Sequence, residues 1–346
     1  MARLKDIAEH VGVSISTVSR VIKNDTSRNV HQETRRKIWE AVKELGYVPN
    51  ENARSLVSNV LSKNSKRTHK VGWVANLKSA EVNPYFSNIY GGVYNALTEA
   101  GYTFVNVYKE ELQNETTLVK TIHESGIEGL ILVEQLDDET LNYITKYVPV
   151  VGIDFFYTDK DMSVIDYDRI SAVKKAVQYL VAKGHTEIGF IGGGIGENYK
   201  DFQAEKRYRG YRYAMEEAGL LINPKWVVNT CWKLDSSYEG MNKIIANGGH
   251  TNLPSAMVCA SDLLAIAAMR AVVAHKLSVP DDIAFIGIDN IELSKYSNPP
   301  LTTIAIPQTE LGEMAAKTLI DHIEKRTVIQ VKIQLPNQLI IRDSTN

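Results

Sequence analysis

The chain has 346 residues, of which 44% are hydrophobic and 23% charged, and its formal net charge is −2 at pH 7. No apolar run approaches the roughly eighteen residues of a membrane span, so the composition is that of a soluble globular protein. The charge is uneven, because residues 1–70 carry a net +7 and the remainder carries −9. A basic patch is typical of nucleic-acid binding, and an acidic body would leave contact with phosphate to the basic head.

The first 45 residues predict three short helices. Apolar residues recur at helical spacing on both sides of Gly12, where a left-handed backbone costs a glycine little. Ser14 has the position of the N-cap of the second helix. A third helix, from about Gln32 to Leu45, carries the apolar residues that would close a small core.

The second predicted helix has an outer side suited to DNA. It presents Ile15, Ser16, Ser19 and Arg20. A helix fits the major groove of B-DNA, where its N-terminal residues reach base edges. Arg20 can take a guanine through two donors, whereas Ile15 offers apolar contact to a thymine methyl. The alternative is a helical hairpin with no partner, and the positive charge of the segment favours DNA.

Residues 59–70 are polar and basic, as in a linker, and from Lys70 onward short apolar runs alternate with amphipathic helices. The predicted strands are 71–75, 102–107, 129–133, 148–154, 188–192, 226–229, 256–260, 283–289 and 338–342. The predicted helices are 88–100, 115–125, 169–183, 206–218, 237–247 and 262–275. This alternation indicates an α/β fold with parallel sheets covered on both faces. Because the run is too long for one such sheet, we expect two doubly wound subdomains with a cleft between them.

Ligands of such sheets bind at the carboxyl ends of the strands. Several acidic and aromatic residues follow predicted strands: Tyr85, Phe86, Asp154, Asp262 and Asp289. Carboxylates accept hydrogen bonds from vicinal hydroxyls and aromatic rings cover C–H faces, so the set suits a sugar. Each aspartate also has a plainer interpretation as the cap of the next helix, Asp262 above all, and the two aromatics as subdomain core.

Signatures of enzymes and cofactors are absent from the sequence. The glycines of residues 190–197 do not satisfy G-x-G-x-x-G, so no nucleotide cofactor is expected. There is no G-x-S-x-G elbow, P-loop or H-E-x-x-H, and the eight histidines lack metal-ligand spacing. Two lone cysteines suit a reducing cytoplasm, and the charged N-terminus argues against the alternative of an exported sugar-binding protein. A carbohydrate-acting enzyme would need paired catalytic carboxylates, which we cannot identify.

Two motifs carry a family resemblance over essentially the whole chain. They are the run from Asp6 to Val21, and Leu45-Gly46-Tyr47-Val48-Pro49-Asn50 followed by Ala53-Arg54-Ser55-Leu56. In these the chain resembles the lac repressor (LacI/GalR) family of bacterial transcription regulators. The resemblance implies a helix-turn-helix DNA-binding domain over 1–49, a hinge helix and linker over 50–69, and a periplasmic-binding-protein-like effector and dimerisation domain over 70–346. Within that domain it implies an N-subdomain of about 70–166 and 304–328 and a C-subdomain of about 167–300 and 331–342.

The resemblance also assigns residues. The DNA-binding positions are Ser14, Ile15, Ser16, Thr17, Ser19, Arg20, Asn50, Ala53, Arg54 and Leu56. Leu56 of two paired hinge helices would wedge into the minor groove and kink the operator. The effector positions are Tyr85, Phe86, Asp154, Arg207, Trp232, Asp262 and Asp289. Arg207 would lie over a pair of hydroxyls, with Asp289 on the other wall and Trp232 as an aromatic platform. Three positions depart from relatives: Arg3 replaces a capping Thr, Ser261 replaces Asn, and the Ile306–Gln308 crossover lacks an aromatic.

The function expected from this layout is repression of carbohydrate-utilisation genes by a cytoplasmic homodimer. A dimer is expected because no heptad tail for tetramerisation follows the last strand. The two heads of a dimer would bind a palindromic operator. A small sugar, of the galactoside type by likeness, would release the operator, and neither a metal nor a cofactor is expected. Ribose, maltose-type sugars and a purine corepressor remain open as effectors.

Overall fold

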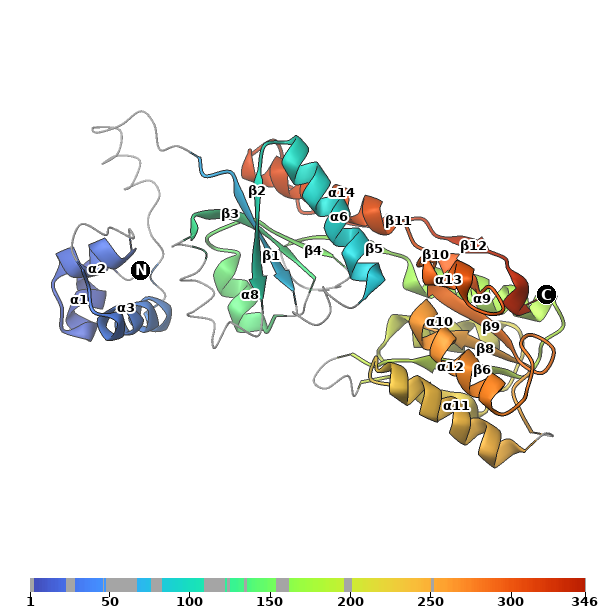
Figure 1. Cartoon of the computed structure of the whole chain (residues 1–346). Coiled ribbons are helices and arrows are strands. Elements are labelled where there is room, and N and C mark those ends of the chain that lie inside the picture. Colours follow the sequence, from blue (N-terminus) through green and yellow to red (C-terminus); the bar gives the residue numbers. More distant parts are fainter. Residues whose placement is uncertain are drawn as a thin grey trace. The chain divides into compact units, whose positions relative to one another are not determined.

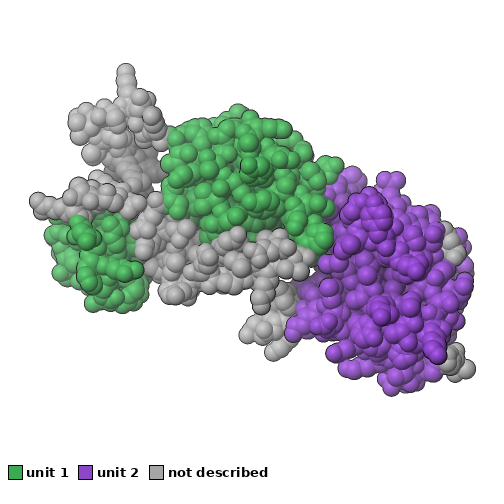
Figure 2. Space-filling view, in the orientation of Figure 1, with its two compact units in different colours: residues 1–166, 309–332 green, residues 167–308, 333–346 purple. Residues whose placement is uncertain are grey.

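The computed structural model describes residues 3–22, 29–45, 47, 67–75, 83–108, 122, 125–133, 136–153, 162–195, 201–249 and 252–345. The chain forms two compact units, one of residues 1–166 and 309–332 and the other of residues 167–308 and 333–346 (Figure 2). Unit 1 includes the basic head, and unit 2 carries the residues around Arg207. No helix of the described residues is both long and apolar enough to cross a membrane.

The head consists of α1 (Leu4–Val11), α2 (Ile15–Ile22) and α3 (Gln32–Glu44), drawn in blue in Figure 1. Gly12 ends α1 with φ 74°, and the Ser14 hydroxyl accepts a hydrogen bond from the Thr17 amide at 3.1 Å, which confirms the predicted cap. At the start of α1 the Arg3 amide donates to Asp6 Oδ2 at 2.7 Å. The core of the head is formed by Ile7, Ala8, Val18, Val21, Ile22, Ile38, Trp39, Ala41 and Val42.

Unit 1 contains a sheet in the order β11-β5-β4-β3-β1-β2, with β1 to β5 running parallel (Figure 1). Its strands are β1 (Lys70–Ala75), β2 (Thr103–Tyr108), β3 (Ile127–Leu132), β4 (Val150–Ile153), β5 (Ser163–Tyr167) and β11 (Lys332–Leu335). Its helices are α6 (Pro84–Glu99), α8 (Asp138–Ile144) and α14 (Gln308–Ile323). α6 and α14 pack backbone to backbone, because a Cβ at Gly92 would lie 2.1 Å from the Thr309 carbonyl and one at Gly312 equally close to that of Ile89.

Unit 2 contains a second sheet, in the order β12-β10-β9-β8-β6-β7. Its strands are β6 (Ile188–Gly192), β7 (Val227–Asn229), β8 (Ala256–Cys259), β9 (Ala284–Asp289), β10 (Thr302–Ala305) and β12 (Gln338–Ile340). All neighbours pair in parallel except β12, which is antiparallel to β10. Its helices are α9 (Arg169–Ala182), α10 (Lys206–Glu217), α11 (Leu234–Gly248), α12 (Asp262–Ala274) and the short α13 (Leu293–Tyr296).

Helices cover both faces of the unit 2 sheet. Ile191 of β6 packs into the core that α11 and α12 share, whereas the ring of its neighbour Phe190 lies 5.2 Å from that of Tyr211 on α10. Successive strand residues point to opposite faces, so the two contacts place α10 on the face away from α11 and α12. The doubly wound α/β fold expected from the sequence is therefore present, with an antiparallel edge strand added.

Several elements differ from those expected. α6 begins at Pro84 and not at Asn88, because the Asn83 side chain caps it by accepting from the Tyr85 amide at 3.1 Å, with proline at N1. α11 begins at Leu234, three residues earlier than expected. The strands β5, β10 and β11 and the helices α8, α13 and α14 were not among the predicted elements. The predicted helix 115–125 lies outside the described residues except for residues 122 and 125.

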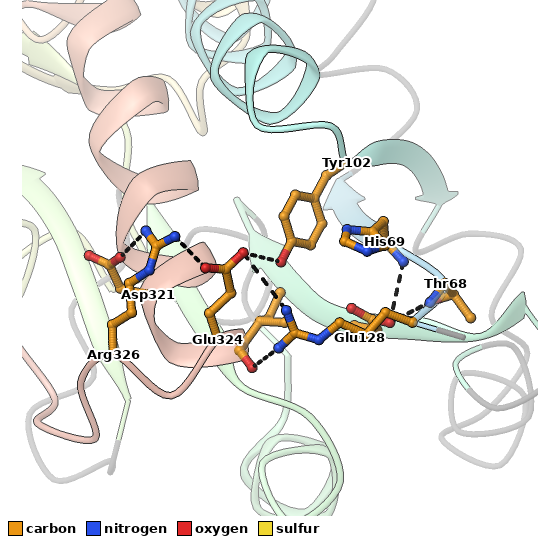
Figure 3. A network of polar contacts seen from close by, with 9 residues as sticks. Thr68, His69, Tyr102, Glu128, Asp321, Glu324 and Arg326 are labelled. Carbon is orange, nitrogen blue, oxygen red and sulfur yellow. Dashed lines mark hydrogen bonds and ion pairs between the residues drawn. The ribbon is translucent and has the colours of Figure 1, made fainter. Parts of the chain in front are cut away.

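The chain enters β1 through a network of polar contacts within unit 1 (Figure 3). Glu128 Oε1 accepts from the Thr68 amide at 2.5 Å, the Thr68 hydroxyl at 3.0 Å and the His69 amide at 3.2 Å. Arg67 donates to the Ile323 carbonyl at 3.1 Å, at the end of α14, and pairs with Glu324 at 3.8 Å. The last residues of the predicted linker are thus attached to both β3 and α14.

Candidate DNA-binding head and effector site

The start of α2 presents the predicted base-reading side chains. Ile15 is 48% exposed although it is a large apolar residue, and Ser14 and Ser16 are exposed beside it. Thr17, Ser19 and Arg20 are half-buried, whereas Val18 and Val21 face the core. An exposed isoleucine on a helix N-terminus costs solvation unless a partner covers it, which suits contact with a thymine methyl. The remaining predicted DNA contacts, Asn50, Ala53, Arg54 and Leu56, lie outside the described residues.

Arg207, in the first turn of α10, is held by two contacts inside unit 2. Its Nε donates to Glu205 Oε1 at 2.9 Å, and its Nη1 donates to the Ala260 carbonyl at the end of β8 at 3.3 Å. Glu205 is also the N-cap of α10, since its Oε2 accepts from the Tyr208 amide at 3.0 Å. Within the described residues Nη2 of Arg207 makes no hydrogen bond, so the guanidinium is oriented but keeps donors for a ligand.

Burial lowers the pKa of Arg207, but the charges of Glu205, Tyr167 and Asp289 act in the opposite direction and the net effect raises that pKa. A buried guanidinium with one close carboxylate stays charged and is costly to leave unpaired. The pair Arg207–Glu205 is therefore a fixed cation site on unit 2, with Glu205 buried and 12% of the Arg207 side chain exposed.

The Trp232 indole lies over Arg207, whose guanidinium carbon is 4.4 Å from the ring centroid. Two features hold the ring: its Nε1 donates to the Gly194 carbonyl at 2.9 Å, and it packs flat on Gly193, where a Cβ would come within 2.4 Å. The glycine-rich segment after β6 thus admits an aromatic ring. Trp232 itself has φ 62°, a left-handed conformation unusual for tryptophan.

Asp289 ends β9 in an unusual conformation, with φ 119°, and Asn290 follows with φ 55°. Burial raises the pKa of the Asp289 carboxyl well above its usual value, and the charge of Asp262 raises it further. The charges of Arg207 and Arg169 lower it, as does the backbone amide of Asp262. No side chain of the described residues hydrogen-bonds this carboxylate. Backbone strain of this kind is concentrated at ligand sites.

Asp262 is fully buried and has both carboxylate oxygens engaged. Oδ1 accepts from the Thr303 hydroxyl at 2.5 Å and Oδ2 accepts from the Ile291 amide at 2.9 Å. The interpretation of Asp262 as a helix cap is wrong, because Ser261 caps α12 by accepting from the Leu264 amide. Asp289 does not cap the next helix either, since α13 has Glu292 at its N-cap. The burial of Asp262 argues against direct contact with a ligand.

The other predicted effector residues belong to unit 1. Tyr85 and Phe86 lie in the first turn of α6 in unit 1, with ring centroids 5.2 Å apart, and Tyr85 is buried. Asp154 lies outside the described residues. Unit 2 alone brings together Arg207, Trp232, Asp262 and Asp289. The described part of the chain holds no cluster of His, Cys, Asp and Glu that could bind a metal.

Four residues around this cluster were missed by the sequence argument: Glu205, Thr303, Gln308 and Arg342. Glutamate is an uncommon N-cap residue, so capping preference did not identify Glu205. Its position two residues before Arg207 was the one local sign that it could pair with that guanidinium. Thr303 and Arg342 lie 41 and 80 residues beyond Asp262 and reach the site through β10 and the C-terminal segment. No local pattern reveals such contacts.

Comparison with known proteins agrees with this architecture. Residues 3–50 match the family described as bacterial regulatory proteins of the lacI family, and residues 177–345 match the periplasmic binding protein-like domain. The ribose operon repressor of Escherichia coli (strain K12) is 35% identical over 348 residues, which cover 99% of this chain and all of the repressor. The chain belongs to the lacI family. It is accordingly a DNA-binding transcriptional repressor of that family.

Other members of the comparison are similar to this lacI-family chain over nearly its whole length. The transcriptional repressor PurR of Pasteurella multocida (strain Pm70) is 33% identical to this chain. The match covers 99% of this chain and 98% of PurR. Among solved structures, a CelR–cellobiose complex has a TM-score of 0.73 at 28% identity, covering 99% of this chain and all of that one. The lac repressor dimer bound to operator and the anti-inducer ONPF has a TM-score of 0.68 at 25% identity, with 99% of each chain covered.

Proposed function

We propose that this repressor binds a palindromic operator as a homodimer in the cytoplasm and releases it when a small sugar binds. The basic head supports the DNA contact, with Ser14, Ile15, Ser16, Thr17, Ser19 and Arg20 on α2 as the major-groove residues. Asn50, Ala53, Arg54 and Leu56 act beside them as the hinge contacts. A lac repressor dimer on its operator, a structure of the same fold, supports the twofold arrangement.

One observation carries the sugar assignment: unit 2 holds a half-buried cation, Arg207, and a buried acid, Asp289, that both keep hydrogen-bonding capacity. Among the described residues Nη2 of Arg207 has no acceptor and the Asp289 carboxylate has no side-chain donor, and the Trp232 ring lies over Arg207. Two adjacent hydroxyls can accept from the guanidinium and donate to the carboxylate, while the indole covers a C–H face. A pentose, a hexose or a galactoside meets this requirement. The ribose repressor and the cellobiose complex support the sugar class.

Release of DNA requires that the sugar bind the two conformational states of the repressor with different affinity, since equal affinity shifts no equilibrium. The purine repressors among the relatives favour a second candidate, a purine corepressor that strengthens operator binding. The two functions differ in the sign of the effect on DNA affinity.

The test is a ligand panel followed by an operator assay. Melting temperatures are measured with D-ribose, D-galactose, lactose, cellobiose, hypoxanthine and guanine, where a ligand at a hundred times its Kd adds about 2.7 kcal/mol of stability. Fluorescence anisotropy on a palindrome obtained by in vitro selection then shows whether the ligand weakens or strengthens operator binding. We expect a sugar to raise the melting temperature and to weaken operator binding. Stabilisation by purines alone, with tighter operator binding, would overturn the sugar assignment.

Substitution tests the site itself. Arg207→Ala and Asp289→Ala should abolish the response to the sugar while DNA affinity persists, because neither residue belongs to the head. Asp168→Asn, which alters the N-cap of α9 in the same unit, is the matched control and should respond as the wild type does. A normal response in either site variant would contradict the assignment.

A further inference from the structure

The turn from Asp289 to Ile291 is held by side chains at four separate points. Gln308 Nε2 donates to the Asp289 carbonyl at 2.5 Å, and the Asn290 amide donates to the Thr303 hydroxyl oxygen at 3.3 Å. The other two contacts are those of the Ile291 amide with Asp262 Oδ2, at 2.9 Å, and of Arg342 Nη2 with Asn290 Oδ1, at 2.6 Å. All of these partners belong to unit 2.

These contacts explain how a strained backbone persists. A non-glycine residue at φ 119°, followed by one at φ 55°, lies in sparsely populated conformations that cost of the order of 1–3 kcal/mol each. Such a turn relaxes to a more common conformation unless several contacts with the surrounding structure hold it. Four hydrogen bonds to consecutive residues provide that constraint, and none of the four uses the Asp289 carboxylate.

Asp262 is the centre of this arrangement. Its Oδ1 accepts from Thr303, which in turn accepts from Asn290, so one carboxylate holds Asn290 indirectly and Ile291 directly. The carboxylate fits because residue 287 is glycine, where a Cβ would lie 2.2 Å from Oδ1. With 0% of its surface exposed, Asp262 acts on a ligand only through the turn.

Arg342 holds the same turn from the C-terminal segment. Besides Asn290 it binds the Leu301 carbonyl at 2.6 Å and the Ser294 hydroxyl at 3.1 Å through Nη1. The planar fork of a guanidinium can serve three acceptors with fixed directions, which a lysine ammonium does not reproduce.

We infer that Asp262, Thr303 and Arg342 are positioning residues that hold Asp289 in the conformation that binds effector, and that none of them contacts the effector. The inference rests on the proposed function, in which Asp289 is the effector acid. It replaces the direct role that the sequence assigned to Asp262.

The charge of Asp262 acts on Asp289 as well. The charged groups that face Asp289 are Asp262 of α12, Arg207 of α10 and Arg169 of α9. The negative charge of Asp262 raises the pKa of Asp289, so removing it lowers the pH at which Asp289 titrates. This shift reports the charge of Asp262, whereas hydrogen exchange and affinity report its hold on the turn.

The first test needs no ligand. Hydrogen–deuterium exchange is followed by mass spectrometry in peptides that span residues 286–294 of the full-length wild type, Asp262→Asn, Thr303→Val and Asp168→Asn. We expect exchange in these peptides to be about tenfold faster in both variants, because the Ile291 amide loses its carboxylate acceptor in Asp262→Asn and the Asn290 amide loses its hydroxyl acceptor in Thr303→Val. Peptides of α10 and β6, and all peptides of Asp168→Asn, should match the wild type. Unchanged exchange at 286–294 in Thr303→Val would overturn the inference.

The second test measures Kd for D-ribose, D-galactose and hypoxanthine by calorimetry. Whichever probe binds the wild type should bind Thr303→Val and Arg342→Lys about tenfold more weakly, and Asp262→Asn should move the pH midpoint of binding downward. Faster exchange with an unchanged Kd would overturn the positioning role. If the wild type binds none of the probes, the proposed effector class fails, and the exchange experiment alone decides whether the turn is held as inferred.

Discussion

Glu128 and Thr68 are joined by a hydrogen bond of 2.5 Å from the Thr68 amide to the Glu128 carboxylate, although 60 residues separate them (Figure 3). The same oxygen also accepts from the His69 amide, so a single side chain satisfies two backbone donors at the start of β1. Arg67, immediately before them, contacts the end of α14 instead. The last residues of the linker are therefore held by backbone amides that donate to Glu128 and by the Arg67 side chain, which binds at the end of α14.

The Glu128 contact should contribute more to stability than the Arg67 ion pair. Glu128→Leu should lower the free energy of unfolding by about 1–3 kcal/mol, because two backbone amides lose their acceptor. Arg67→Met should cost less than about 1 kcal/mol, since solvent screens the Arg67–Glu324 pair. Urea denaturation of the two variants measures both values. Glu128→Gln, which keeps an acceptor oxygen, is the control, and equal losses in all three variants would contradict this ranking.

Substitution of Gly193 should disturb the aromatic platform. In Gly193→Ala the new methyl group would meet the Trp232 ring at 2.4 Å, so the indole must move off Arg207. We expect the affinity for the effector to fall about tenfold, with a shift in tryptophan fluorescence. Gly91→Ala is the matched control, because its methyl group enters open space on α6 and should raise stability by up to about 1 kcal/mol. Wild-type affinity in Gly193→Ala would show that Trp232 is no platform.

Stability should depend on pH through Asp262. Burial raises the pKa of Asp262 from 3.8 to about 7, with hydrogen bonds from Thr303 and Ile291 opposing the rise. The folded state therefore binds the proton more tightly than the unfolded state, and stability falls as pH rises through the interval between those two pKa values. The slope is at most about 1.4 kcal/mol per pH unit for this one group.

The difference between wild type and Asp262→Asn isolates this effect. Urea midpoints measured from pH 4 to pH 8 should show the wild type losing stability relative to the variant as pH rises, with the difference levelling off near neutral pH. A difference that stays constant over the whole range would mean that Asp262 is ionised throughout.

Leu56→Ala should reduce specific operator binding by about tenfold or more, because the kinked duplex loses its apolar wedge. Sugar binding should be unaffected. Anisotropy on the selected palindrome and on random DNA gives both affinities, and Leu221→Ala, at a side chain that is 91% exposed in unit 2, is the control. Equal loss on both DNAs would assign Leu56 a general role rather than an operator-specific one.

Affinity for DNA should also fall steeply with salt, because counterions are released when the basic head meets phosphates. A series of anisotropy titrations at rising salt concentration measures the slope. A flat profile would argue against the head as the DNA-binding part.

Local chemistry was sufficient to predict the head. The conformation of Gly12 and the cap at Ser14 depend on neighbours within three residues, and the observed helices follow the predicted ones closely. The alternation of strands and helices from Lys70 onward could also be predicted, because hydrophobic periodicity shows which elements are buried on both faces. The start of α6 was missed although its signal, Asn83 before Pro84, is local.

What the sequence by itself determined is therefore the fold class, the family and most of the strands with the residues that follow them. The tertiary structure decided what those residues do. Asp262 looked like a helix cap or a ligand, and it is a buried acceptor for Thr303 and Ile291, because β9 and β10 lie side by side and bring both donors to it. The orientation of Arg207 depends on Glu205 and on the Ala260 carbonyl of another strand. Contacts of this kind depend on the pairing of distant segments, and no periodicity along the chain encodes which side chains that pairing will bring together.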